Sequence, residues 1–336
     1  MKRIVTVIFL FFLPVMYTHA LGELDMQSEA QYRRELGQYP ITVAPISLPG
    51  TRSYDYVFID IDKVILVNRL QLTEINLSTG EQKIIEIPEE WAEDRDLGFR
   101  YIQYDKAANS VHINLESRAP HRQTYHILHL DDYSWEAIEE LGNEIESFYY
   151  DSKNMLIYVQ HFITYETESG YRRKKNITTY DLQRREIIDS VELPEGTIHV
   201  YCIYGTSPKI LASAFNQIGN DRHFFIYDIS TGTRTDYPES DIFMLFLGSF
   251  NLSAACIPVN EDGSFLFIEN ARRGNISSIA LLNLNTNTLE KVALENFPYS
   301  IDNLKQITEG RYSFIVGTRT WAGGHGPQFL CFLDYP

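Results

Sequence analysis

Short apolar runs separated by polar turns recur along the chain from residue 39 to its end. Each copy holds an apolar strand that ends in Asp or Asn, then a polar turn and a second short strand. Successive strand ends are 55, 50, 47, 55 and 51 residues apart, an interval that suits four strands of five or six residues plus their turns. The pattern therefore predicts six copies of one four-stranded unit. The strand ends are Asn76, Asp131, Asp181, Asp228, Asn283 and Asp334.

A second pattern precedes the first within the copies. Turn clusters such as Tyr104–Asn109 stand between two apolar runs and predict hairpin loops of three to five residues. The unit becomes strand A, hairpin, strand B, variable loop, strand C, turn, strand D. Residues Val111–Leu115 alternate apolar side chains with His112 and Asn114, which is the period of a strand.

The last copy ends after its third strand, at Pro336. The segment Tyr39–Pro49 near the start resembles the fourth-strand segments Lys83–Pro88 and Ile187–Pro194, so it can supply the missing strand. Such closure removes exposed sheet edges. We expect an all-β fold: a six-bladed β-propeller of four-stranded antiparallel blades, formed by residues 39–336 as one domain and closed by residues 39–49 in the last blade.

The turn from Tyr227 to Gly232 reads Tyr-Asp-Ile-Ser-Thr-Gly and is similar to the blade turn of many bacterial propellers. The chain after its first 20 residues resembles the TolB-like class of six-bladed propellers. This resemblance implies the fold and carries no activity.

The first 20 residues have the organisation of a cleavable signal peptide. Lys2 and Arg3 are followed by the apolar stretch Ile4–Tyr17 and by Thr18–Ala20, a small-residue cleavage site. An uncleaved anchor is the alternative, although the apolar stretch is short for a membrane span. We expect residues 21–38 to form a lead-in segment that is either a short helix or a loose stretch of chain. The chain is then periplasmic or secreted, without stable membrane insertion or a lipidation Cys.

Composition narrows the possible partners and cofactors. The formal net charge is −16, and this acidity disfavours nucleic acid as a partner. The three cysteines, Cys202, Cys256 and Cys331, lie in apolar runs and are interpreted as buried small side chains, although an oxidising compartment permits one disulfide. Their spacing matches no zinc motif, so we expect neither a metal nor a cofactor.

The candidate binding face is the side of the ring that carries the loops between strands B and C and the connections between blades. Loops on a rigid scaffold are where binding residues concentrate. Each blade contributes an Arg to this face, and the guanidinium group suits carboxylate, phosphate or sulfate. The last blade adds a Gly-rich loop with a Trp that offers a stacking surface. The candidate ligand-binding residues are Arg69, Arg118, Arg122, Arg173, Arg222, Arg272, Arg319, Trp321 and His325.

The alternative for these cations is pairing with acids of the neighbouring connections, among them Glu144 and Glu146. We expect a non-enzymatic, monomeric propeller that binds a protein, an acidic glycan or another anionic ligand through this face. The alternative function is a hydrolase or lyase that acts on glycans or small molecules at the channel mouth. A cluster of Arg, Glu and Tyr on the inner strands would favour the enzyme. No catalytic residue can be assigned from the sequence.

Overall fold

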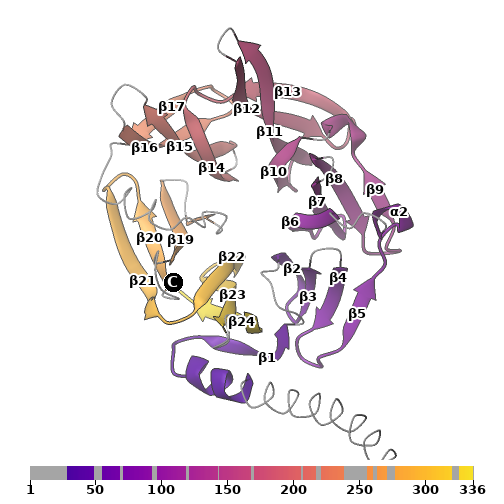
Figure 1. The fold of residues 1–336 in the computed structure, drawn as a ribbon, viewed down its shortest axis with the longest axis vertical. Coiled ribbons are helices and arrows are strands. Elements are labelled where there is room, and N and C mark those ends of the chain that lie inside the picture. Colours follow the sequence, from indigo (N-terminus) through magenta and orange to yellow (C-terminus); the bar gives the residue numbers. More distant parts are fainter. Residues whose placement is uncertain are drawn as a thin grey trace, which may run out of the picture.

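The computed structural model describes residues 29–48, 55–68, 71–92, 97–118, 121–142, 144–167, 170–205, 207–216, 221–237, 256–259, 263–270, 277–319 and 325–335. These residues form six four-stranded antiparallel sheets arranged as blades around one axis (Figure 1). The chain winds each of the first five blades from the innermost strand outward. The predicted signal peptide and the first part of the lead-in segment lie outside the described residues.

Blades 1 to 3 are consecutive meanders, with the short helices α2 (Glu89–Ala92) and η1 (Glu139–Leu141) in the connections that follow blades 1 and 2. Blade 1 contains β2 (Asp55–Asp60), β3 (Lys63–Asn68), β4 (Gln71–Asn76) and β5 (Gln82–Ile85); blade 2 contains β6 (Leu97–Asp105), β7 (Ser110–Arg118), β8 (His121–His129) and β9 (Trp135–Ala137); blade 3 contains β10 (Ile145–Asp151), β11 (Leu156–Thr167), β12 (Gly170–Asp181) and β13 (Glu186–Glu192).

Blades 4 and 5 repeat this order, and blade 6 is completed by the strand from the start of the described chain. Blade 4 contains β14 (Thr197–Tyr204), β15 (Lys209–Asn216), β16 (Asp221–Asp228) and β17 (Arg234–Tyr237); blade 5 contains β18 (Ile257–Pro258), β19 (Ser264–Asn270), β20 (Ser277–Asn283) and β21 (Thr288–Phe297); blade 6 contains β22 (Ser300–Thr308), β23 (Arg311–Arg319), β24 (His325–Asp334) and β1 (Thr42–Leu48).

The predicted ring closure by the N-terminal strand is confirmed. Strand β1 pairs antiparallel with β24, with Thr42 opposite Phe332 and Leu48 opposite Gln328. Ala44 and Leu48 of β1 are buried in the apolar cluster between blades 6 and 1. The strand therefore contributes both ladder hydrogen bonds and core side chains to the closure.

In blades 1, 3, 4 and 5 the Asp or Asn that marks the repeat accepts hydrogen bonds in the turn between strands C and D. The side-chain oxygen Oδ1 of Asn76 accepts from the backbone N–H groups of Ser78 and Thr79, at 2.9 Å each. Asp181 and Asp228 make the equivalent pairs of bonds. Short polar side chains favour such turns because they replace a backbone acceptor. The repeat seen in the sequence is thus a repeat of turn chemistry.

The described residues form six apolar core clusters, one at each interface between neighbouring blades. Strand β3 shows the principle: Val64 and Leu66 face blade 6, while Ile65 and Val67 face blade 2. Both faces of a blade are covered, so apolar residues can occupy successive positions on its strands. On β7, the polar residues His112 and Asn114 are as deeply buried as the apolar residues Val111, Ile113 and Leu115 with which they alternate, so this alternation does not mark a solvent-facing side.

The lead-in segment is helical over residues 29–36 and packs on blade 6. Leu36 is fully buried in the cluster between blades 5 and 6. The Arg33 guanidinium donates to the Ala44 carbonyl oxygen at 2.7 Å and lies 5.0 Å from the centre of the Phe329 ring. The helix is therefore fastened to the same blade that β1 completes.

Candidate ligand-binding face

The strand registers bring the predicted Arg positions to one side of the ring. In blades 2, 3, 4 and 6 these residues lie at or near the ends of the hairpins between strands B and C, where topology places all such hairpins on the same face. Arg118 lies opposite His121, Arg122 opposite Ser117, Arg173 opposite Thr164, Arg222 opposite Phe215, and Arg319 opposite His325.

The backbone positions are described for these residues, and their side chains are not. Arg69, Arg272 and Trp321 lie outside the described residues altogether. The side chains of Arg118, Arg122, Arg173, Arg222, Arg319 and His325 also lie outside them. The structure thus places five Arg positions and His325 on one face by register, and their assignment to a ligand stays a prediction.

Basic residues of the same hairpins whose side chains are described have acidic partners. Lys175 Nζ lies 3.1 Å from Glu146 Oε2, and Lys174 Nζ lies 2.5 Å from Glu192 Oε1. The Lys175 side chain is only 8% exposed, so its charge is held within blade 3. For Lys175, the structure shows the pairing with a neighbouring acid that the sequence left as an alternative. Glu192, the partner of Lys174, lies on β13 and was not among the expected acids.

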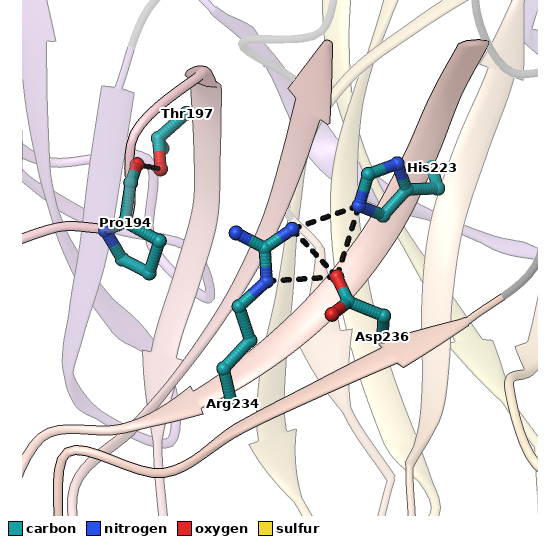
Figure 2. A network of polar contacts seen from close by, with 5 residues as sticks. All are labelled: Pro194, Thr197, His223, Arg234 and Asp236. Carbon is teal, nitrogen blue, oxygen red and sulfur yellow. Dashed lines mark hydrogen bonds and ion pairs between the residues drawn. The ribbon is translucent and has the colours of Figure 1, made fainter. Parts of the chain in front are cut away.

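His223 of blade 4 is also engaged within its own blade. Figure 2 shows the His223, Arg234 and Asp236 side chains pointing toward one another from β16 and β17. Asp236 Oδ1 accepts from Arg234 Nε at 2.7 Å and lies 2.9 Å from His223 Nε2, while Arg234 Nη2 lies 2.8 Å from the same His nitrogen. His223 Nε2 can accept from Arg234 only when it carries no proton.

The turn that leads into blade 4 holds a second polar contact. Thr197 Oγ1, at the start of β14, donates a hydrogen bond to the Pro194 carbonyl oxygen at 2.5 Å (Figure 2).

Among the residues that the structure describes, three ion pairs lie on or beside the inner strands, which are the strands nearest the ring axis (Figure 1). Lys305 Nζ of β22 lies 2.5 Å from Asp55 Oδ1 of β2. Arg100 of β6 makes a two-pronged contact with Glu116 of β7, in which Nη2 donates to Oε1 at 2.9 Å and Nε also bonds the carboxylate. The pair of Lys175 and Glu146 is the third. We call these six residues, together with Tyr101, the inner polar cluster.

The carboxylate of Asp55 joins three blades. Its Oδ1 binds Lys305 of blade 6, and its Oδ2 accepts from the Ile102 backbone N–H of blade 2 at 2.9 Å. Gln103 of blade 2 similarly exchanges two hydrogen bonds with the Tyr150 backbone of blade 3, at 2.6 and 2.9 Å. Directional bonds between blades fix the spacing of the inner strands, which apolar packing alone leaves freer.

The Tyr101 phenol interacts electrostatically with one residue of each of the three ion pairs. Burial raises the pKa of its phenol, Arg100 lowers it, and the Glu146 and Asp55 carboxylates raise it further. The phenol therefore stays protonated and can donate a hydrogen bond at neutral pH. Asp302, three residues before Lys305 on β22, also has a raised pKa because of its burial.

The charges of the inner polar cluster balance, since each of its three cations faces its own carboxylate. The cluster offers hydrogen-bond donors and acceptors without a net positive charge. Sequence reasoning missed Asp55, Arg100 and Lys305, which belong to strands and not to loops. One sequence feature could have indicated these residues: a charged residue within an inner strand, such as Arg100 in the apolar surroundings of Phe99 and Ile102.

The described residues contain no group of three or more His, Cys, Asp or Glu side chains that could hold a metal ion. No helix in this part of the chain is long and apolar enough to span a membrane.

No family model matches the chain, and no curated protein matches it. Solved structures match at the level of fold. The chain is similar to an oligogalacturonate lyase in complex with manganese, with a TM-score of 0.50 and 11% identity over 82% of this chain and 75% of that one. TolB from Acinetobacter baumannii has a TM-score of 0.46 and 12% identity, over 91% and 68%. An acylaminoacyl peptidase has a TM-score of 0.47 and 12% identity, over 82% and 46%, so the chain spans less than half of that peptidase.

Proposed function

We propose that this six-bladed propeller is an exported binding protein whose B–C hairpin face recognises an anionic macromolecular ligand, such as an acidic glycan. The observation that carries the proposal is the register of four blades, which puts Arg118, Arg122, Arg173, Arg222 and Arg319 near the hairpin ends of one face. A polyanion that spans several blades would receive charge-assisted hydrogen bonds from several of them.

The Arg positions lie farther out along the strands than the neutralised ion pairs. Arg118 follows Glu116 by two residues on β7, and Arg173 precedes Lys175 by two on β12, a step of about 7 Å along each strand. Because Arg100 already binds Glu116 and Lys175 already binds Glu146, those acids are occupied by inner cations. This arrangement supports a neutral inner layer that holds the strands and an outer layer of arginines for a ligand.

The β11–β12 hairpin supports the same proposal. Its two strands have 12 residues each, the greatest length among the described strands. Arg172, Arg173, Lys174 and Lys175 follow one another on β12. A long hairpin with consecutive cations can reach a ligand that lies across the face.

The test is binding of a sulfated polysaccharide, a polyuronate and a polyphosphate, with neutral dextran for comparison. The variant Arg118→Gln, Arg173→Gln, Arg222→Gln should bind the preferred polyanion at least tenfold more weakly, since a loss of about 1.4 kcal/mol already gives that factor. The matched control is Lys153→Gln, Arg184→Gln, Arg311→Gln, which removes the same charge from the turns of the opposite face. It should bind like the unmodified protein. Equal loss in both variants, or no binding of any polyanion, contradicts the proposal.

The inner polar cluster favours a second candidate function, a hydrolase or lyase that acts on glycans at the channel mouth. Arg100, Tyr101, Glu116 and Glu146 are an Arg, Tyr and Glu set on or beside the inner strands, and the raised pKa of Asp302 suits a proton donor. Product analysis after incubation with the bound polyanion separates the two functions. Cleavage that Asp302→Asn abolishes would establish the enzyme, and an unaltered ligand supports simple binding.

A further inference from the structure

We infer that Cys202 and Cys256 form an intramolecular disulfide that links the inner strands of blades 4 and 5. The two residues are 54 positions apart in the sequence, and they come together at the interface between the blades. Cys331 lies at another interface, between blades 5 and 6. The fold therefore selects one pair among the three cysteines.

The contact arises from an irregularity in β14. The pairing of β14 with β15 shifts between Val200 and Cys202, so the strand holds one extra residue there. A bulge of this kind re-aims side chains. Tyr201 and Cys202 both pack against the cluster that contains Cys256, whereas Val200 packs toward blade 3.

The two cysteines meet at one seam. Cys256 is buried in the apolar cluster between blades 4 and 5, the Cys202 side chain packs against that cluster, and β14 contacts β18 there. The Cys202 side chain also has the largest effect on the pKa of the Cys256 thiol, which it raises. Two thiols that pack at one seam can close a covalent bond with a small adjustment of the side chains.

Oxidation needs a partner that accepts two electrons, for which a small-molecule disulfide such as oxidised glutathione suffices. Cys202 is partly exposed, so its thiolate attacks a glutathione sulfur, forms a mixed disulfide and releases one glutathione thiol. Cys256 then loses its proton and attacks the Cys202 sulfur, which releases the second glutathione thiol. The net change is two protein thiols oxidised to one disulfide and one glutathione disulfide reduced to two thiols.

The order of these steps follows from the environments. The hydrogen bond to Cys202 and burial raise the pKa of Cys256, so this thiol is a poor first nucleophile. Burial also raises the pKa of Cys331, which keeps it unreactive. The link would reinforce an inner strand that is short in the described chain, since β18 spans Ile257–Pro258 and pairs with β19 at two positions.

The experiment treats the purified full-length protein with oxidised glutathione, then counts free thiols after unfolding and maps the linked peptides by mass spectrometry. We expect one free thiol, on Cys331, and one cross-linked pair of peptides that contain Cys202 and Cys256. The thermal midpoint should then fall by about 5 °C on addition of reductant.

Variants separate this link from other oxidation. Cys331→Ala should still form the link and leave no free thiol, whereas Cys202→Ala should form none and show no effect of reductant on its thermal midpoint. Three free thiols after oxidation, or a link through Cys331, would overturn the inference. The measurement depends on neither the ligand nor the cellular location.

Discussion

Buried polar residues determine the chemistry inside the blades. His112 of β7 is fully buried, stacks on the Tyr150 ring of blade 3 with centroids 3.8 Å apart, and has Nδ1 2.6 Å from the Tyr125 hydroxyl. Tyr150 in turn donates to Asp105 at 2.8 Å. His126 of β8 is also buried, with Nε2 2.8 Å from Thr124 Oγ1 and its ring against Trp91. Both imidazoles are thus held at interfaces that favour their neutral form.

These histidines predict a loss of stability in mild acid. Burial lowers the pKa of His112 and of His126 from the usual 6.5 to about 4, although Asp105 partly offsets this for His112. Unfolded histidines take up protons as pH falls through 6.5, while the folded ones do so only near 4. The stability they contribute is complete above pH 6.5 and is lost toward pH 4, by about 2 kcal/mol per histidine between pH 7 and 5.

Urea unfolding at pH 7 and pH 5 measures this effect. In His112→Phe the decrease in unfolding free energy over this range should be about 2 kcal/mol smaller than in the unmodified protein, whatever the stability of the variant at pH 7. His126→Phe should behave alike. The same decrease in the variants and the unmodified protein would show that these groups titrate normally in the folded chain.

At the scale of elements, β1 is the strand on which closure of the ring depends. It brings blade 6 to four strands and buries Leu48, which is 4% exposed, against blade 1. The helical residues 29–36 strengthen the same attachment, since Arg33 binds the Ala44 carbonyl and Tyr299 bonds Glu35. Closure by a strand distant in sequence makes the two ends of the described chain depend on each other.

A matched pair of truncations tests this closure. Leu48→Ala should lower the unfolding free energy by about 2–3 kcal/mol, because it leaves a cavity between blades 6 and 1. Ile84→Ala, on the outer strand β5 where the side chain is 63% exposed, should change it by less than about 0.5 kcal/mol. Denaturant unfolding compares the two. Equal effects would mean that β1 contributes little to the closed ring.

At the scale of the whole molecule, the fold could be predicted because it is specified by short sequence patterns, in which the interacting residues are only a few positions apart. Asn76, Asp181 and Asp228 mark turns of three blades through bonds to the backbone N–H groups two and three positions on, and Asp or Asn recurs at this place in the sequence of every blade. Burial of His112 and Asn114 could not be read in this way, since the neighbouring blade covers that face of β7. In a propeller, both faces of a blade pack against neighbouring blades. The polar residues of an alternating strand can therefore be buried as well.

Part of the candidate site could likewise be predicted from local sequence signals, and part of it could not. The positions of Arg118, Arg173 and Arg222 follow from hairpin topology, which the repeat specifies. The inner polar cluster depends on contacts between residues as distant as Asp55 and Lys305, and no local pattern reports such contacts. Glu146, the partner of Lys175, was among the acids expected to pair with these cations, and it lies on β10 of the same blade. Glu192, the partner of Lys174, lies on β13 and was not expected.

The most direct measurement of the binding face is hydrogen exchange of backbone amides with and without the polyanion that binds best. We expect slower exchange in the B–C hairpins β7–β8, β11–β12, β15–β16 and β23–β24, because the proposed ligand would lie across these four blades. The turns of the opposite face, such as those at Asp105–Asn109 and Asp181–Arg185, should exchange at unchanged rates. Protection concentrated in those turns, with the B–C hairpins unaffected, would contradict the assignment of the ligand to this face.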